Sequence, residues 1–347
     1  MFRRAARLRP TLISRRIDSV ERVGRHLVAL FIALAVIAGC SKSSVSPSLP
    51  RGDHQTRIYV ADWANHRIVR MSDMRGGGWT TLGGVEGGST EASQFPVGVC
   101  VDAAGRIYVS EQYHHRIWRV DDMVGHNRVE FSPPGAAAKP VNKYAGSWIC
   151  VDRSGRIYVT YDGEHAIVRM DDMGGAGRVA FGTEGSGVGQ FRYPAGLTVD
   201  EQGHIYVCDF DNFRVVRMDD MQGSNWTELG AYGSGQCEFI NPCGICVDDR
   251  GRIYVADQGN DRIVRFDDLR GTNWTTIGSF GTASEAGKLY APTGICVDRA
   301  GRIYVTQCSS NHRIVRMDDM QGTKWTVFGG GGTGFGTFGS PMGIYVR

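Results

Sequence analysis

Residues 292–329 read PTGICVDRAGRIYVTQCSSNHRIVRMDDMQGTKWTVFG, and this stretch decides the fold. It contains four short apolar runs, GICV, RIYV, RIVRM and WTVF, separated by polar or Gly-bearing turns. Such spacing is typical of four successive antiparallel strands. No run reaches the roughly 10 to 12 residues that a helix needs, and β-branched and aromatic residues dominate. The stretch therefore predicts one four-stranded sheet.

The same pattern recurs along the chain at a nearly fixed period. Its second strand recurs in steps of 48 to 50 residues, with the equivalent isoleucines at Ile58, Ile107, Ile157, Ile205, Ile253 and Ile303. Self-similarity at this period predicts a propeller or a solenoid.

The number of copies distinguishes these architectures. The second strand occurs six times, but the first copy, at Arg57, has no GICVD before it. The missing strand is at the other end of the chain, where residues 341–346 read PMGIYV and no second strand follows. A ring covers both faces of every sheet and hides the edge of the first. We therefore predict an all-β, six-bladed propeller in which Gly343–Val346 lies beside Arg57–Val60. The expected blades are 341–347 with 57–83, then 96–131, 144–182, 194–230, 242–278 and 292–329.

The pattern PxGICVDxxGRIYVADxxNxRIVRM closely resembles the NHL repeat, which implies a six-bladed, TolB-like propeller. The clearest copies of its NxR element are at residues 65–67, 260–262 and 311–313, and weaker ones are at 114–116, 164–166 and 212–214. The resemblance covers nearly all of residues 57–347. It implies a scaffold rather than an activity.

The first forty residues have the features of an export signal. Eight arginines precede or flank a short apolar run, residues 27–38, which is too short for a comfortable membrane span of about 20 residues. The sequence IAGC at 37–40 looks like a bacterial lipobox, so Cys40 is predicted to be lipidated. An ordinary signal peptide followed by an unrelated Cys is the alternative. We expect a signal peptide at 1–40, a Ser- and Pro-rich tether at 41–56 and the propeller at 57–347. By resemblance to lipoproteins, Ser41 favours the outer membrane, with the protein facing the periplasm or the exterior.

Removal of the signal changes the sign of the net charge. Without its eight arginines and two acidic residues, 31 basic residues remain against 34 acidic ones. A nucleic-acid-binding protein should show a basic footprint. Some NHL propellers bind RNA, but export and this acidic balance argue against a nucleic-acid partner.

The cysteines are interpreted as structural. Four occupy the same position in the first strand of their blades, which indicates a buried small side chain: Cys100, Cys150, Cys246 and Cys296. Cys243 and Cys246 form a CxxC motif, but three residues apart on a strand they point to opposite faces. A disulfide between Cys237 and Cys243, which flank one loop, is an alternative that the sequence leaves open.

Repeated charged residues are also attributed to the scaffold. A third-strand Arg followed by Asp-Asp or Ser-Asp recurs in every blade, which favours an interblade or turn-capping network over six active sites: Arg70, Arg119, Arg169, Arg217, Arg265 and Arg316. The histidines at 66, 115, 165 and 312 likewise come with the repeat. We therefore predict no catalytic residue, no metal ligand and no cofactor, although a divalent metal in the channel is conceivable for this fold.

Departures from the repeat are the best guide to a site. Blade 3 begins with an unusual loop, SPPGAAAKPVNKYAGSW, and Trp148 stands where five other blades have Gly. A Gly there lets backbones approach closely, so we expect Trp148 to project into or cap the channel mouth. Blades 2 and 3 also lack the fourth-strand Trp of the other blades. Neutral drift of these two blades is the alternative. The predicted binding residues are Tyr113, His114, Lys143, Tyr144, Trp148, Tyr161, Asp162 and Glu164.

Two classes of function follow. The favoured one is a monomeric, non-enzymatic module, held at the membrane only by its lipid anchor, that binds a protein, peptide or glycan at the channel mouth. The alternative is a metal-assisted lyase or hydrolase, because similar propellers include amidating lyases, lactonases and antibiotic lyases. That alternative rests on fold analogy.

Overall fold

The structure is a computed structural model that describes residues 56–84, 95–112, 116–133, 147–281 and 285–347. All described residues belong to the second of two units along the chain, residues 54–347. The predicted signal peptide, Cys40 and the tether lie outside the described residues. In the described part of the chain, no helix has the length and apolar character that crossing a membrane requires.

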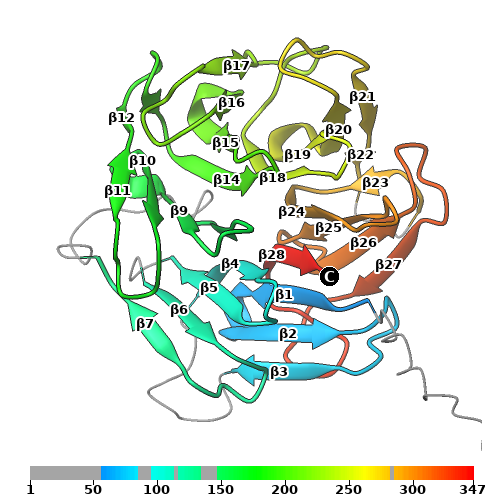
Figure 1. The fold of residues 1–347 in the computed structure, drawn as a ribbon. Coiled ribbons are helices and arrows are strands. Elements are labelled where there is room, and N and C mark those ends of the chain that lie inside the picture. The colour runs from blue at the N-terminus through cyan, green and yellow to red at the C-terminus, as the bar shows by residue number, and fades with distance from the viewer. Residues whose placement is uncertain (1–55, 85–94, 113–115, 134–146, 282–284) are drawn as a thin grey trace, which may run out of the picture. The chain divides into compact units, whose positions relative to one another are not determined.

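The second unit contains six four-stranded antiparallel sheets arranged around one axis (Figure 1), as the repeat predicts. Blade 1 consists of β28 (Pro341–Val346), β1 (Ile58–Asp62), β2 (Arg67–Met71) and β3 (Thr80–Gly83). Blade 2 consists of β4 (Pro96–Val101), β5 (Ile107–Glu111), β6 (Ile117–Val120) and β7 (Val129–Phe131). Blade 3 consists of β8 (Ile149–Val151), β9 (Ile157–Tyr161), β10 (Ala166–Met170) and β11 (Val179–Phe181).

The remaining blades repeat this order from the inner to the outer strand. Blade 4 consists of β14 (Pro194–Val199), β15 (Ile205–Asp209), β16 (Arg214–Met218) and β17 (Thr227–Leu229). Blade 5 consists of β18 (Pro242–Val247), β19 (Ile253–Asp257), β20 (Arg262–Phe266) and β21 (Thr275–Ile277). Blade 6 consists of β24 (Pro292–Val297), β25 (Ile303–Gln307), β26 (Arg313–Met317) and β27 (Thr326–Gly329).

The C-terminal strand completes the first blade. β28 pairs antiparallel with β1, with Val346 opposite Ile58 and Ile344 opposite Val60. The backbones of Arg57 and Arg347 also exchange two hydrogen bonds of 2.9 Å. The first and last strands of the propeller therefore share one sheet, which is the arrangement that the sequence predicts.

The inner strands lie in backbone contact around the axis because a glycine near the start of the strand permits it in every blade except blade 3. A Cβ atom at Gly196 would lie 2.3 Å from the carbonyl oxygen of Cys243, and one at Gly294 would lie 2.3 Å from that of Met342. Any side chain there would force the strands apart. Blade 3 has Trp148 at this position, and its inner strand β8 has three residues where β14 has six.

Two ends of the ring carry different connections. One end, here called the loop face, carries the corners between second and third strands and the linkers between blades. Four of these corners are short 3-10 helices: η1 (Trp63–Asn65), η4 (Asp162–Glu164), η5 (Phe210–Asn212) and η6 (Gln258–Asn260). Two linkers contain small parallel ladders, β12 (Thr183–Glu184) with β13 (Gln190–Phe191) and β22 (Ser279–Phe280) with β23 (Lys288–Leu289). The opposite end, the turn face, carries the two other turns of each blade.

Candidate functional site

A set of polar side chains fastens each described linker on the loop face to the blade that follows it. In blade 4, Asp209 accepts hydrogen bonds from Asn212 (2.8 Å), from Nε of Arg214 (2.9 Å) and from the backbone N–H of Arg192 (2.6 Å). Arg214 then donates to the carbonyl oxygens of Ser186 and Gln190 in the preceding linker. We call this Asp–Asn–Arg set the loop latch, because it holds the linker backbone through buried, charge-assisted hydrogen bonds.

The loop latch recurs in other blades with nearly the same distances. Asp62 accepts from Asn65 and from Arg67 at 2.8 Å each, and Arg67 donates to the carbonyl oxygen of Thr337 at 2.8 Å. The other members are Asp257, Asn260 and Arg262 in blade 5, a related Gln307, Asn311 and Arg313 in blade 6, and Glu111 with Arg116 in blade 2.

Blade 3 differs from the other five at all three latch positions. It has Tyr161, Glu164 and Ala166 where blade 4 has Asp209, Asn212 and Arg214. Ala166 has no side-chain hydrogen-bond donor, and Tyr161 lacks the carboxylate that accepts from the Arg in blade 4. Blade 3 therefore cannot form the loop latch, and the linker that the latch would hold is the unusual segment before Trp148.

Of the eight predicted binding residues, the structure describes four. Trp148, Tyr161 and Asp162 are buried, with exposed fractions of 8%, 1% and 0%, whereas Glu164 is half-buried. Burial also raises the pKa of the Tyr161 hydroxyl. Tyr113, His114, Lys143 and Tyr144 lie outside the described residues.

Trp148 fills space at the inner end of the blades. Its backbone N–H donates to Thr160 Oγ1 at 2.8 Å. Its indole belongs to an apolar cluster with Val97, Ala195 and Met342, which lie on the inner strands of blades 2, 4 and 1. The indole is therefore enclosed by apolar side chains of the inner strands.

The missing fourth-strand Trp of blade 2 has a packing explanation. In blade 4 the Arg214 guanidinium lies 5.7 Å from the centre of the Trp226 ring. In blade 2 the positions of the cation and the ring are reversed. The ring is that of Trp118 on the third strand, β6, and the guanidinium of Arg128, just before the fourth strand, lies 4.6 Å from its centre. Trp118 Nε1 donates to Glu111 at 2.8 Å. This Arg–Trp contact supplies packing at the outer strands of blade 2, where the fourth-strand Trp is missing.

The repeated histidines and third-strand arginines have structural roles. Nδ1 of His165 accepts the backbone N–H of Tyr193 at 3.2 Å, and Nδ1 of His66 accepts that of Phe95 at 3.3 Å. Arg217 pairs with Asp219 at 2.8 Å within one blade. The following Asp220 caps the turn by accepting two backbone N–H groups. The turn-capping interpretation holds, whereas these Arg–Asp pairs are not interblade contacts. Among the described residues, no group of three or more His, Cys, Asp or Glu side chains is arranged to hold a metal ion.

The eight described cysteines are free thiols. The disulfide between Cys237 and Cys243 that the sequence left open is therefore absent. Cys243 lies in the apolar cluster of Trp148, and Cys246 packs against a different cluster, as expected for opposite faces of one strand.

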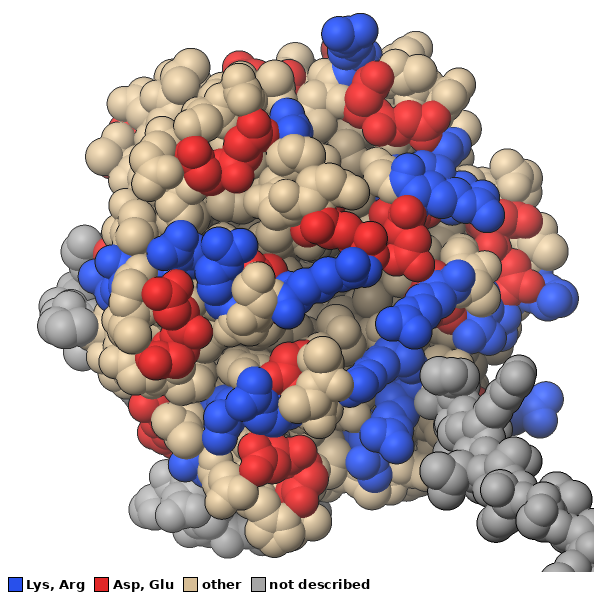
Figure 2. Space-filling view, viewed as in Figure 1, with Lys and Arg blue, Asp and Glu red and all other residues tan. Residues whose placement is uncertain are grey.

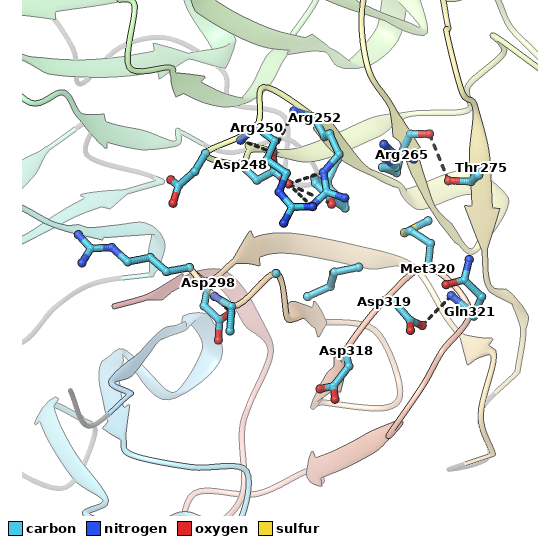
Figure 3. Close-up of a pocket in the computed structure, with 16 residues that line it drawn as sticks. Asp248, Arg250, Arg252, Arg265, Thr275, Asp298, Asp318, Asp319, Met320 and Gln321 are labelled. Carbon is cyan, nitrogen blue, oxygen red and sulfur yellow. Dashed lines mark hydrogen bonds and ion pairs between the residues drawn. The ribbon is translucent and has the colours of Figure 1, made fainter. Parts of the chain in front are cut away.

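The turn face has a polar cleft that the sequence did not indicate. It has a volume of about 330 Å³ and lies between blades 5 and 6 (Figure 3). Its lining is dominated by repeated pairs such as Arg252 with Asp248 at 2.6 Å, and Thr275 donates to the backbone of Arg265. Because blades 2, 3, 5 and 6 carry the same Asp–Arg pair, and blade 4 has Asp200 with His204, no sequence signal singled out this cleft. On the face shown in Figure 2, Lys and Arg are interspersed with Asp and Glu.

Comparison with known proteins agrees with this architecture. Four segments, residues 94–120, 191–218, 239–266 and 289–317, match the NHL repeat. The chain is therefore a six-bladed β-propeller built with NHL repeats. No curated protein matches it.

Solved structures with a similar fold are distant in sequence. A chain in a nidogen/laminin complex is 15% identical, with 84% of this chain and 98% of that chain covered and a TM-score of 0.61. A protein of unknown function from Bacteroides caccae has the same identity and coverage and a TM-score of 0.57. A streptogramin B lyase is 18% identical over 67% of each chain, with a TM-score of 0.49. At such identities the likeness shows the fold alone.

Proposed function

We propose that the protein is an exported, lipid-anchored binding module whose loop face at blades 2 and 3 takes a protein, peptide or glycan. The observation that carries this proposal is the coordinated change in blade 3. All three loop-latch positions, the linker before them and the inner-strand Gly differ together in that one blade.

The physical consequence of this change concerns the linker before blade 3. In blade 4, donors of Arg214 fix the carbonyl groups of the preceding linker, so that linker has little freedom to adapt. Blade 3 has Ala166 instead of this Arg, so no side chain at this position can donate a hydrogen bond to the preceding linker. Binding residues commonly lie on such loops, supported by a rigid scaffold. The proposed contacts are Tyr144 and Lys143 on this linker, together with Glu164 in the blade 3 corner.

Site-directed crosslinking tests the location of the binding surface. A photocrosslinkable residue at Glu164 is expected to capture a partner in the native envelope, and Tyr144→Ala with Lys143→Ala should reduce capture at least tenfold. The matched control is the same crosslinker at Ala64, on the corresponding corner of blade 1. Equal capture from both positions, or capture unaffected by the two substitutions, would contradict the proposed sector.

A metal titration separates this proposal from a metal-assisted lyase or hydrolase. A binding module should show no stoichiometric, chelator-sensitive rise in Tm when Zn²⁺, Mn²⁺ or Mg²⁺ is added. A saturable rise with one ion per chain would favour the enzyme.

A further inference from the structure

On the turn face, five of the six blades share a cluster of donors and two carboxylates. In blade 2, Asp102 accepts hydrogen bonds from Nε of Arg106 at 2.6 Å and from the hydroxyl of Tyr108 at 3.1 Å. Arg119, directly opposite Tyr108, pairs with Asp121 at 3.6 Å. Blades 3 to 6 have the same arrangement, with a His in place of the first Arg in blade 4. In blade 2, two Asp side chains therefore balance two Arg side chains.

Blade 1 has the donors of this cluster without its two carboxylates. Arg57, Tyr59 and Arg70 occupy the donor positions, and Tyr59 lies directly opposite Arg70. Ser72 stands where blade 2 has Asp121. In the described part of the chain, neither Arg57 nor Arg70 forms an ion pair with an Asp or Glu side chain.

The position of the other carboxylate is taken by Arg347. The backbone N–H of Arg347 donates to the carbonyl oxygen of Arg57, as that of Asp102 donates to Arg106 in blade 2. The guanidinium of Arg347 donates to the carbonyl oxygens of Asp102 and Ala103, so it contacts the backbone of the next blade. A position that is negatively charged in the other blades is thus positively charged in blade 1.

The donors of blade 1 lie on one face of its sheet. Arg57 and Tyr59 are two residues apart on an extended segment, and directly opposite residues such as Tyr59 and Arg70 share a face. Arg57 is exposed and Arg70 is half-buried, whereas Tyr59 is buried. Opposite Arg70 on β3, the Thr80 hydroxyl is buried and has no hydrogen-bond partner among the described residues.

The equivalent side chains of blade 5 show that a solute can reach this surface. Arg252, Arg265 and Thr275, which correspond to Arg57, Arg70 and Thr80, line the cleft in Figure 3. In blade 5 the guanidinium of Arg252 is already paired with Asp248, one of the two carboxylates that blade 1 lacks.

We propose that Arg57, Tyr59 and Arg70 form a binding site for a phosphate group on the turn face of blade 1. A free phosphate or a phosphate monoester carries a charge of about −1.5 to −2 at pH 7, which is close to that of the two Asp side chains of each other blade. Its unprotonated oxygens accept hydrogen bonds, and the two guanidinium groups and the hydroxyl donate them. The site is at the opposite end of the ring from the loop face, so it does not depend on the proposed binding module.

Isothermal titration calorimetry with three soluble probes tests the site and the source of the phosphate. The probes are inorganic phosphate, glycerol 3-phosphate and glycerophosphoglycerol, which is a phospholipid headgroup without its acyl chains. The purified full chain, at fixed ionic strength and free of other oxyanions, should bind one phosphate, and the dianionic probes should bind at least about threefold more tightly than the diester. Tighter binding of the diester would assign the site to a lipid headgroup. No saturable binding of any probe would overturn the proposal.

Substitutions assign the binding to these side chains. Arg57→Gln and Arg70→Gln should each weaken binding about tenfold or more, because each removes a charge-assisted donor. The matched control is Arg265→Gln, which changes the blade 5 equivalent of Arg70 and should leave the affinity unchanged. Equal affinities in Arg70→Gln and Arg265→Gln would overturn the assignment.

Ser72→Asp tests the charge argument without removing a donor. It restores the carboxylate that pairs with the third-strand Arg in the other five blades, so it should abolish phosphate binding and raise the Tm in phosphate-free buffer by about 1–2 °C. Asp53, the nearest acidic residue to Arg57 in sequence, lies outside the described residues, and Asp53→Asn should leave the affinity unchanged. Undiminished phosphate binding in Ser72→Asp, or binding that appears only in Asp53→Asn, would refute the proposal.

Discussion

Asp209 is a buried carboxylate whose pKa is set by the balance between burial and its hydrogen bonds. It is fully buried, yet it accepts hydrogen bonds from Asn212, Arg214 and the backbone of Arg192. Burial disfavours its charged form more than these donors favour it, which raises the pKa of Asp209 to about 6. Burial likewise raises the pKa of Asp257, the equivalent residue of blade 5.

The raised pKa of Asp209 predicts a pH-dependent contribution to stability. The pKa of this group in the unfolded chain is about 3.9, so the folded protein takes up the proton first as the pH falls. Its contribution to the free energy of unfolding is fully present below pH 4 and is lost as the pH rises through about 6. Relative to Asp209→Asn, the native protein should therefore gain about 2 kcal/mol between pH 7 and pH 4, measured by urea unfolding.

Asp220 is a control for which the pH dependence of stability has the opposite sign. It is partly exposed, and hydrogen bonds from Ser224 and Gln222 lower its pKa, so any contribution that it makes to the free energy of unfolding is lost on acidification. If Asp209→Asn and the native protein have parallel pH profiles over this range, the carboxylate does not titrate as argued.

Trp148 marks the limit of prediction at the scale of a residue. Its place in the repeat, where the other blades have Gly, predicted that its side chain would project into or cap the channel mouth. Its burial was not predictable, because the side chains that enclose it, such as Val97 and Met342, belong to blades far away in the sequence. A residue that departs from the repeat can therefore still be buried.

At the scale of an element, the blade combines a regular sheet with a fastened linker. The strands were predictable because their apolar runs alternate with turns at fixed spacing. The D-x-x-N-x-R spacing of the loop latch was visible too, for example at residues 62–67, but its acceptors were not. They are backbone carbonyl groups of a linker, such as that of Ser186, and carry no side-chain pattern.

The loop latch should make a large contribution to stability. Arg214→Ala leaves the Asp209 carboxylate buried without its cation and removes donors from two carbonyl groups of the linker. Loss of one partner from a buried ion pair costs about 3–5 kcal/mol, and we expect this loss in chemical unfolding. Arg217→Ala, which removes a more exposed Arg–Asp pair of the same strand, should cost about 1 kcal/mol or less. Similar losses in both variants would mean that the loop latch adds nothing beyond a surface pair.

At the scale of the whole propeller, the repeat count alone predicted that the chain end would complete the first blade. The orphan strand PMGIYV and the incomplete repeat at Arg57 made this inference possible. The repeat count could not show that blade 2 also contacts the C-terminal residue. The Arg347 side chain donates to the carbonyl oxygens of Asp102 and Ala103, so the last residue also fastens blade 1 to blade 2.

Deletion of residues 341–347 should therefore destabilise the ring well beyond the loss of one strand. It exposes the edge of β1 and removes the buried side chains of Met342, Ile344 and Val346, each worth about 1.5–3 kcal/mol. We expect a much lower Tm, with hydrogen exchange accelerated in blades 1, 2 and 6 before the others. Arg347→Ala, which keeps β28 and removes only the guanidinium contacts, should shift the Tm by no more than a few degrees. A truncated protein that melts like the full chain would show that the ring does not depend on its closing strand.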